Sequence, residues 1–242
     1  RALPLSEPQP TKCPAAKGED RGPIEGLKKL GRIDCVNGMS NEFPCRETNL
    51  KSFISLDEMG SASDERGNDV WGWTDPDDAS HEYVIFGATD GSSFVDITVA
   101  EKPEALGFMP TTTVSSTWRD MKVYKDHVFV VAEAADHGMQ VFDMKRLRGL
   151  TPSSTRRLEA DMTYHEVGSV HNIVINEDTG FAYLVGCTTC AGGLLIVDIS
   201  EPKNPVHAGC YSEDGYTHDA QCVVYSGPDH RFLGHEICFA YN

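Results

Sequence analysis

The chain has 242 residues, of which 37 are acidic and 21 are basic, so its formal net charge is −16. A surface of this charge repels nucleic-acid phosphates, and we expect no nucleic-acid partner. No apolar run reaches the roughly 18 residues that a membrane helix needs, so the sequence predicts no transmembrane segment in this chain.

The first part of the chain has little periodicity. Residues 1–33 are rich in Pro, Gly, Lys and Glu, which predicts an extended leader. Because the sequence begins with Arg1 and carries no signal peptide, we expect a processed or trimmed start. Residues 34–67 are predicted to form a compact cap and a linker, held by a Cys35–Cys45 disulfide across a turn-rich loop.

From residue 68 onward the sequence repeats about every 50 residues. Turn residues between short apolar runs indicate about four strands in each unit. A second motif, apolar-apolar-Asp-apolar, follows in three of the units, at residues 94–97, 141–144 and 196–199. Each unit opens with a polar doublet just before its first strand: Asn68-Asp69, Arg119-Asp120, His171-Asn172 and His218-Asp219.

The repeat predicts an all-β fold, a β-propeller of four-stranded blades preceded by an irregular, disulfide-stapled N-terminal segment. The predicted blades span about residues 68–110, 116–167, 168–213 and 216–242, and the last has only two strands. About three and a half blades cannot close a ring, and they leave open strand edges. We therefore expect a missing C-terminal half, self-association with another chain, or the N-terminal segment to complete the propeller.

The chain has eight cysteines, and four disulfides formed in an oxidising compartment are the simplest interpretation. Cys187 and Cys190 fit a redox pair, half of a zinc site or a structural loop disulfide. The flanking strands offer no helix N-terminus to lower a thiol pKa, and no second CxxC is present for a zinc ribbon, so we favour a structural Cys187–Cys190 disulfide. The sequence leaves four cysteines without an assigned partner: Cys13, Cys210, Cys222 and Cys238.

Several phrases of the sequence are distinctive in wording, beyond their composition. They are Cys35–Met39, Phe43–Cys45, Trp71–Asp75, Trp118–Tyr124, His137–Asp143, His171–Glu177, Gly215–Cys222 and Gly227–Asp229. Through them, roughly residues 35–242 resemble the choice-of-anchor B family of secreted β-propellers, which is related to the LVIVD-repeat proteins. The resemblance implies an exported propeller, often anchored at the cell surface through a C-terminal segment that lies beyond the point where this sequence ends. It implies no particular activity.

The first strand of each propeller blade lines the central channel, so the repeat position places the doublets near one channel mouth. Oxygen-rich side chains with two imidazoles suit Ca²⁺, or alternatively Zn²⁺ or Mn²⁺. A competing structural interpretation is that the doublets satisfy strand-end amides and lock neighbouring blades together. The predicted metal ligands are Asp69, Asp120, His171, Asn172, His218 and Asp219.

Two functions follow as hypotheses. The first is an extracellular or cell-surface propeller that binds or scaffolds a protein or glycan partner, with a structural Ca²⁺ near the channel. The alternative is a metal-dependent hydrolase or lyase at the channel mouth, in which His171, His218 and Asp219 are the catalytic residues. Nucleophile elbows, P-loops and HExxH motifs are absent from the sequence, so nucleophilic hydrolysis and nucleotide chemistry have no support.

Overall fold

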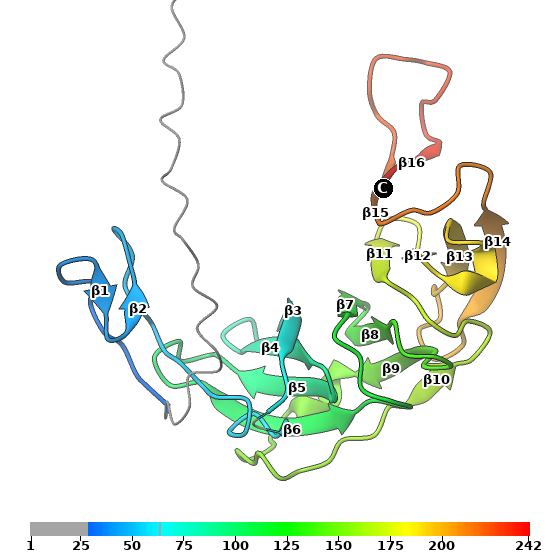
Figure 1. Cartoon of the computed structure of the whole chain (residues 1–242). Helices are drawn as coiled ribbons and strands as arrows, with labels where there is room; N and C mark the ends of the chain where they lie inside the picture. Colours follow the sequence, from blue (N-terminus) through cyan, green and yellow to red (C-terminus); the bar gives the residue numbers. More distant parts are fainter. Residues whose placement is uncertain (1–28, 63) are drawn as a thin grey trace, which may run out of the picture.

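The computed structural model describes residues 29–62 and 64–242, which form strands and loops almost throughout (Figure 1). The helical elements in this part of the chain are two short 3-10 turns, η1 (Met144–Leu147) and η2 (Thr188–Cys190). The predicted all-β fold class is confirmed. No helix among the described residues has the length and apolar character to cross a membrane.

Three four-stranded antiparallel sheets follow one another along the chain, each with its strands in sequence order. The first sheet is β3 (Gly67–Thr74), β4 (Glu82–Ala88), β5 (Gly91–Asp96) and β6 (Glu104–Pro110). The second sheet is β7 (Arg119–Tyr124), β8 (His127–Ala132), β9 (Met139–Asp143) and β10 (Met162–Tyr164). The third sheet is β11 (Asn172–Asn176), β12 (Phe181–Val185), β13 (Leu194–Asp198) and β14 (Val206–Tyr211).

Two hairpins flank these sheets. A small hairpin of β1 (Met39–Ser40) and β2 (Phe43–Pro44) precedes the first sheet. The terminal hairpin, β15 (Asp219–Val224) and β16 (Glu236–Tyr241), follows the third sheet. The predicted four-stranded units are therefore present three times, and the fourth unit has two strands, as the sequence indicates.

The aspartate of the repeated third-strand motif ends that strand in the same way in every sheet. Its Oδ1 accepts a hydrogen bond from the backbone N–H two residues on, which makes an Asx turn. The pairs are Asp96 with Thr98 at 2.8 Å, Asp143 with Lys145 at 3.0 Å and Asp198 with Ser200 at 2.8 Å. In the first and third sheets the same motif also contains a β-bulge, at residues 94–95 and 196–197. The sequence repeat is thus a repeat of local structure.

The sheets lie beside one another along an open arc, with their first strands neighbouring each other (Figure 1). Strand β7 contacts β3 on one side and β11 on the other, and β11 contacts β15. The described residues do not close into a ring. The four-stranded antiparallel sheets are therefore confirmed, whereas the complete propeller stays a prediction.

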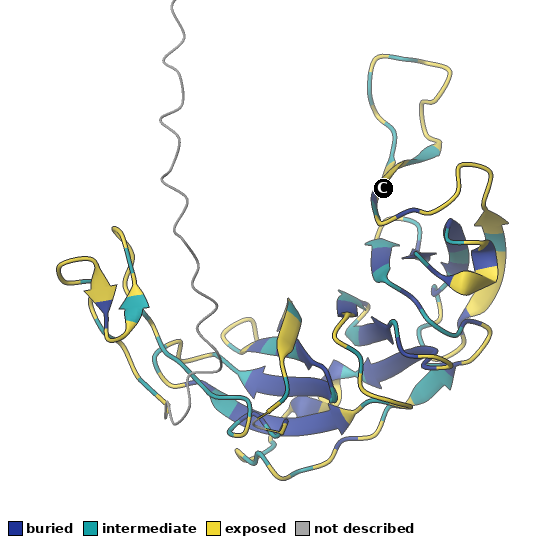
Figure 2. Cartoon of the chain, viewed as in Figure 1, coloured by how far each residue is buried: buried dark blue, intermediate teal, exposed yellow. Residues whose placement is uncertain are grey.

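The hydrophobic core lies between neighbouring sheets rather than within one of them (Figure 2). Between the first and second sheets, the rings of Phe94 and Phe142 pack with their centroids 4.7 Å apart, and both residues are fully buried. Between the second and third sheets, Phe129 and Ile173 belong to another fully buried cluster. Between the third sheet and the terminal hairpin the cluster is smaller and centres on Val185. The smallest apolar cluster is therefore the one at the C-terminal end of the arc.

The disulfides confirm one sequence prediction and correct another. Cys35 pairs with Cys45, as predicted. Cys190 pairs with Cys210 and not with Cys187, whose thiol is free and buried. The prediction of a Cys187–Cys190 disulfide is therefore wrong. The pairing of Cys13 lies outside the described residues.

The physical reason for the correction is the position of η2. Cys187, the residue just before η2, packs into the core between the second and third sheets. Burial there raises the pKa of its thiol. Strand β14 then returns beside β13 and brings Cys210 to Cys190. The partner of Cys190 comes from a neighbouring strand, so the local CxxC spacing does not reveal it.

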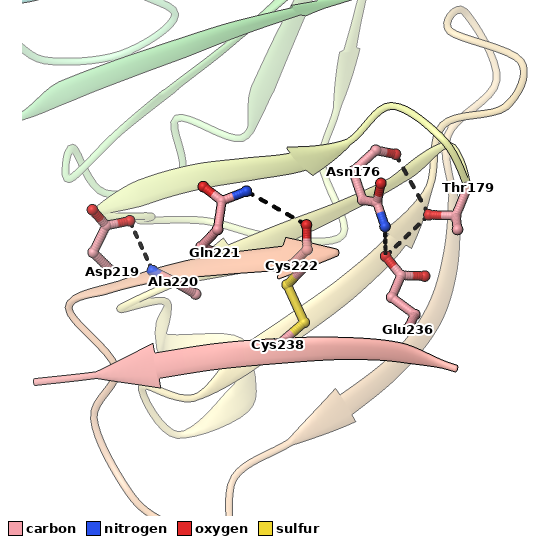
Figure 3. The surroundings of a disulfide bond; sticks show 8 residues. All are labelled: Asn176, Thr179, Asp219, Ala220, Gln221, Cys222, Glu236 and Cys238. Carbon is pink, nitrogen blue, oxygen red and sulfur yellow. Dashed lines mark hydrogen bonds between the residues drawn. A yellow bond between two sulfur atoms is a disulfide. The ribbon is translucent and has the colours of Figure 1, made fainter. Parts of the chain in front are cut away.

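A third disulfide holds the terminal hairpin together. Cys222 and Cys238 lie directly opposite each other in the β15–β16 register and are bonded (Figure 3). The Asn176 side chain in the third sheet donates to a carboxylate oxygen of Glu236 at 2.6 Å, which ties β16 to β11. Three disulfides among the described residues indicate that the chain matures in an oxidising environment.

The N-terminal segment is attached to the first sheet. Backbone bridges join Leu30 to Phe53 and Ile33 to Leu50, so the segment folds back on itself outside the sheet. The Ser52 hydroxyl donates to the Ala100 carbonyl at 2.8 Å, next to the first sheet. Of the predicted leader, residues 1–28 lie outside the described residues.

Candidate functional site

The second residues of the four doublets occupy equivalent places at the start of four neighbouring strands. They are Asp69 on β3, Asp120 on β7, Asn172 on β11 and Asp219 on β15. All four line one cavity of about 420 Å³, which we call the doublet cavity. The repeat position thus brings together residues that are 150 positions apart in the sequence, counted from 69 to 219.

The cavity wall continues two residues further along each strand. Alternate residues of a strand share one face, so the side chains at i and i+2 point the same way. Accordingly the doublet cavity is also lined by Trp71, Lys122, Val174 and Gln221. The doublets alone did not identify these residues, although the period of two in each first strand contained the signal.

The carboxylates of the doublets have a shared local role. Asp69, Asp120 and Asp219 each accept a hydrogen bond from the backbone N–H of the next residue, at 2.6 to 2.8 Å. The other oxygen of Asp120 accepts from the N–H of Ile173 at 2.8 Å and so connects the second sheet to the third. These bonds agree with the structural interpretation of the doublets, in which they satisfy strand-end amides and join neighbouring sheets.

Two asparagines make the equivalent connections. The side-chain oxygen of Asn68 accepts from the backbone N–H of Arg119 at 2.8 Å, which links the first sheet to the second. The Asn172 amide donates to the backbone carbonyl of His218 at 3.1 Å, which links the third sheet to the terminal hairpin. Every junction between neighbouring first strands is therefore bridged by a doublet side chain.

Asp120 is the most perturbed carboxyl group of the cavity. It is buried, and burial together with the neighbouring Asp69 side chain raises its pKa from 3.8 to about 6. Lys122 opposes this shift, since its ammonium lies 2.7 Å from Oδ1 of Asp120. The same ammonium sits 4.4 Å from the ring centroid of Trp71. The cavity thus presents acceptors, one cationic donor and an aromatic face.

A second, adjoining cavity of about 320 Å³ contains the two predicted histidines, and we call it the histidine cavity. The Nε2 atoms of His171 and His218 are 3.0 Å apart. The Nδ1 atom of His171 lies 2.6 Å from a carboxylate oxygen of Glu133. The cavity wall consists of Asn68, Asp69, Trp118, His171, Asn172 and His218. Glu133 was missed by sequence reasoning, because it follows β8 and belongs to no repeated motif.

The first residue of the second doublet, Arg119, lies in the core and not in the wall of either cavity. Arg119 is fully buried; its Nε donates to the Ala88 carbonyl at 2.9 Å, and its Nη1 lies 3.0 Å from Nε2 of His137. Burial lowers the pKa of Arg119 to about 10. Burial and the adjacent guanidinium lower the pKa of His137 to about 4, so this imidazole is neutral and accepts from Arg119. The hydrogen bond from Arg119 to Ala88 joins the second sheet to the first.

The six predicted metal ligands are divided between the two cavities. Asp120 and Asp219 line the doublet cavity, His171 and His218 line the histidine cavity, and Asp69 and Asn172 line both. Within residues 29–62 and 64–242, no group of three or more His, Cys, Asp or Glu side chains is arranged to hold an ion. Of the three alternative catalytic residues, the structure brings His171 and His218 together but places Asp219 in the other cavity. The metal site stays a prediction.

No protein-family model matches the chain, and no curated protein matches it either.

Proposed function

We propose that this chain forms an extracellular or cell-surface β-propeller that acts as a binding module for a glycan partner. The observation that carries the proposal is the doublet cavity, to which each of four successive first strands contributes an equivalent polar side chain. Support for the propeller comes from the repeated four-stranded sheets and their arrangement along an arc. The three disulfides and the resemblance to the choice-of-anchor B family support a location outside the cell.

The cavity chemistry suits sugar hydroxyls. Carboxylates and amides accept and donate the short hydrogen bonds that hydroxyl groups make, and an aromatic ring offers a flat apolar face to the C–H side of a pyranose. Trp71 lies on the cavity wall and is 39% exposed, so the part of its ring that the Lys122 ammonium leaves uncovered is accessible. The histidine cavity adds Trp118, which is also exposed. A protein partner that presents hydroxyl and amide groups would use the same contacts.

The negative charge of the chain and of the doublet cavity limits which glycans are expected to bind. The formal net charge is −16, and the doublet cavity is lined by four acidic residues and one basic residue, Lys122. The acidic residues are Asp69, Asp120, Glu177 and Asp219. Like charges at close range are unfavourable. The proposal is therefore for neutral or basic glycans, and sulfated or sialylated ones are disfavoured.

A divalent cation is part of the proposal. The oxygen atoms of the doublet carboxylates and of Asn172 are the hard ligands that Ca²⁺ prefers, and a sugar hydroxyl pair would complete the coordination of such an ion. The alternative function, a metal-dependent hydrolase or lyase, gains less support, because Asp219 and the two histidines line different cavities.

The test is glycan-array binding by the full chain, followed by calorimetry with the best glycan. Trp71→Ala and Asp219→Asn are each expected to weaken binding roughly tenfold or more. The first removes the aromatic face, and the second removes the carboxylate charge that strengthens a hydrogen bond from a hydroxyl group. Phe239→Ala and Asp229→Asn are the matched controls, because both residues lie outside the cavity walls. Calcium dependence is read by adding EDTA. Binding by Trp71→Ala that equals the wild type, or no bound glycan at all, contradicts the proposal.

A further inference from the structure

The histidine cavity contains a pair of imidazoles from different sheets whose ring nitrogens converge on one point. His171 precedes β11 and His218 precedes β15, and their Nε2 atoms are 3.0 Å apart. His218 is exposed, whereas His171 is partly buried beneath it. The meeting point therefore opens to solvent on one side and is anchored in the protein on the other.

The tautomer of His171 follows from its other partner. A carboxylate only accepts hydrogen bonds, so Nδ1 of His171 carries the proton that it donates to Glu133 at 2.6 Å. Nε2 of His171 then carries a lone pair, which accepts a hydrogen bond from Nε2–H of His218 at 3.0 Å. A metal ion that binds between the two rings would take the place of this proton. This is the arrangement in which a histidine serves as a metal ligand, with an outer carboxylate that fixes the ring and raises its basicity.

From this geometry we infer that His171 and His218 form a binding site for a borderline divalent transition-metal ion, with Glu133 as a positioning residue. Two nitrogens 3.0 Å apart, each bonded at about 2.1 Å, would subtend an angle of about 90° at the ion. Such an angle is that of neighbouring positions in square-planar or octahedral coordination, which Cu²⁺ and Ni²⁺ favour over the tetrahedral geometry of Zn²⁺. Cu²⁺ is also the most tightly bound divalent ion of its row.

The remaining coordination positions face the histidine cavity. Its wall includes the Asp69 carboxylate, together with space for water. The net charge of −16 raises the local concentration of cations around the chain. The site is distinct in chemistry from the calcium proposal, because imidazole nitrogens suit borderline ions and carboxylate oxygens suit hard ones. It also stands independently of glycan binding.

The experiment is a titration of the full chain with Cu²⁺, followed by electron paramagnetic resonance and calorimetry. We expect one equivalent of Cu²⁺ with a hyperfine pattern from two imidazole nitrogens. Excess Zn²⁺ should compete for the site, whereas excess Ca²⁺ should not. His218→Asn should abolish the two-nitrogen pattern and weaken binding roughly 100-fold or more, because a direct ligand contributes at least as much as an outer partner.

Glu133→Gln tests the positioning role. This variant keeps the shape of the side chain but removes its charge, so the two-nitrogen pattern should persist while Cu²⁺ affinity falls roughly 10- to 100-fold. Glu159→Gln and His207→Asn are the matched controls at exposed positions, and both should bind Cu²⁺ like the wild type.

Two results overturn the inference. One is a wild-type chain that gives no one-to-one complex with two nitrogen ligands. The other is a His218→Asn variant that binds Cu²⁺ with wild-type affinity. His218→Asn is the deciding variant, because the exposed His218 side chain contributes little to the core, whereas His171 is partly buried. A thermal melt of each variant without metal verifies the fold.

Discussion

The junction between the first and second sheets differs sharply from the junction between the third sheet and the terminal hairpin. The first junction is sealed: the rings of Phe94 and Phe142 pack with their centroids 4.7 Å apart, and the fully buried Arg119 donates to the Ala88 carbonyl of the first sheet. The second junction is open: its apolar cluster is small and the His218 side chain is exposed. Both junctions nevertheless begin with the same kind of doublet.

The two residues of each doublet have separate structural roles. The second doublet residue, together with Asn68, bridges neighbouring first strands through backbone groups, and this role is retained along the arc. The first doublet residue is free to vary. An arginine there closes a junction by reaching between the sheets, whereas a histidine leaves a cavity with ring nitrogens exposed to solvent. We therefore expect a functional site at a junction that retains its doublet but has only a small apolar cluster.

The largest effect should come from truncating the sealed junction. Phe142→Ala removes a fully buried ring that packs against Phe94, and we expect the free energy of unfolding to fall by about 3–5 kcal/mol. The measurement is urea unfolding followed by tryptophan fluorescence and circular dichroism.

The matched change at the open end is Phe239→Ala. This ring lies on β16 and is 55% exposed, so its loss should cost less than about 1 kcal/mol. Similar costs for the two variants would contradict the distinction between a sealed and an open junction.

The next largest effect should come from the disulfide that joins β14 to the loop before β13. Replacing both Cys190 and Cys210 by alanine should lower the free energy of unfolding by roughly 3 kcal/mol, because the closed loop of 20 residues no longer restricts the unfolded chain. Thermal unfolding and peptide mapping without reduction measure the effect.

Cys187→Ala is the control for the disulfide variant. It should leave all three described disulfides intact and cost about 1 kcal/mol for the lost packing of a small buried side chain. Loss of the Cys190–Cys210 peptide in this variant would contradict the assigned pairing.

The sequence predicted those features that depend on local periodicity. The spacing of the doublets and the third-strand motif identified the sheets, and the turn-rich loop identified the Cys35–Cys45 pair. Features set by contacts between neighbouring strands were not predicted. The Cys190–Cys210 bond depends on how β14 pairs with β13, and the role of Glu133 depends on how the second sheet faces the third.

The arrangement of the doublet residues was predicted only in part. Their clustering followed from the repeat position, since equivalent residues of neighbouring first strands must lie close together. Their division into two cavities did not follow, because it depends on which side of each strand a side chain leaves. The side chain of His171 lines the histidine cavity, whereas those of Asp120 and Asp219 line the doublet cavity.

A smaller effect concerns the pH dependence of stability, where two buried groups oppose each other. The pKa of Asp120 is raised from 3.8 to about 6, so the folded state holds this proton more tightly, and the contribution to stability is lost as pH rises toward 6. The pKa of His137 is lowered from 6.5 to about 4, so its contribution is present above pH 6.5 and lost as pH falls toward 4. The two contributions partly cancel between pH 4 and 6.

Asp120→Asn should therefore expose the contribution of His137. We expect the free energy of unfolding of this variant to fall more steeply on acidification from pH 6.5 to 4 than that of the wild type, by roughly 1–3 kcal/mol over the interval. Chemical unfolding at several pH values gives the slopes, with Glu159→Gln as the exposed carboxylate control. An unchanged slope would contradict the raised pKa of Asp120.

The smallest global effect should come from removing the Cys35–Cys45 disulfide. The β1–β2 hairpin lies outside the sheets, and the Leu30–Phe53 and Ile33–Leu50 bridges close its segment on itself, so the hairpin can open without the sheets. Replacing both cysteines by alanine should change the global free energy of unfolding by less than about 0.5 kcal/mol. Hydrogen exchange should accelerate only between residues 35 and 49. A global loss of roughly 2–3 kcal/mol, the value for a loop of this size, would instead show that the hairpin unfolds together with the first sheet.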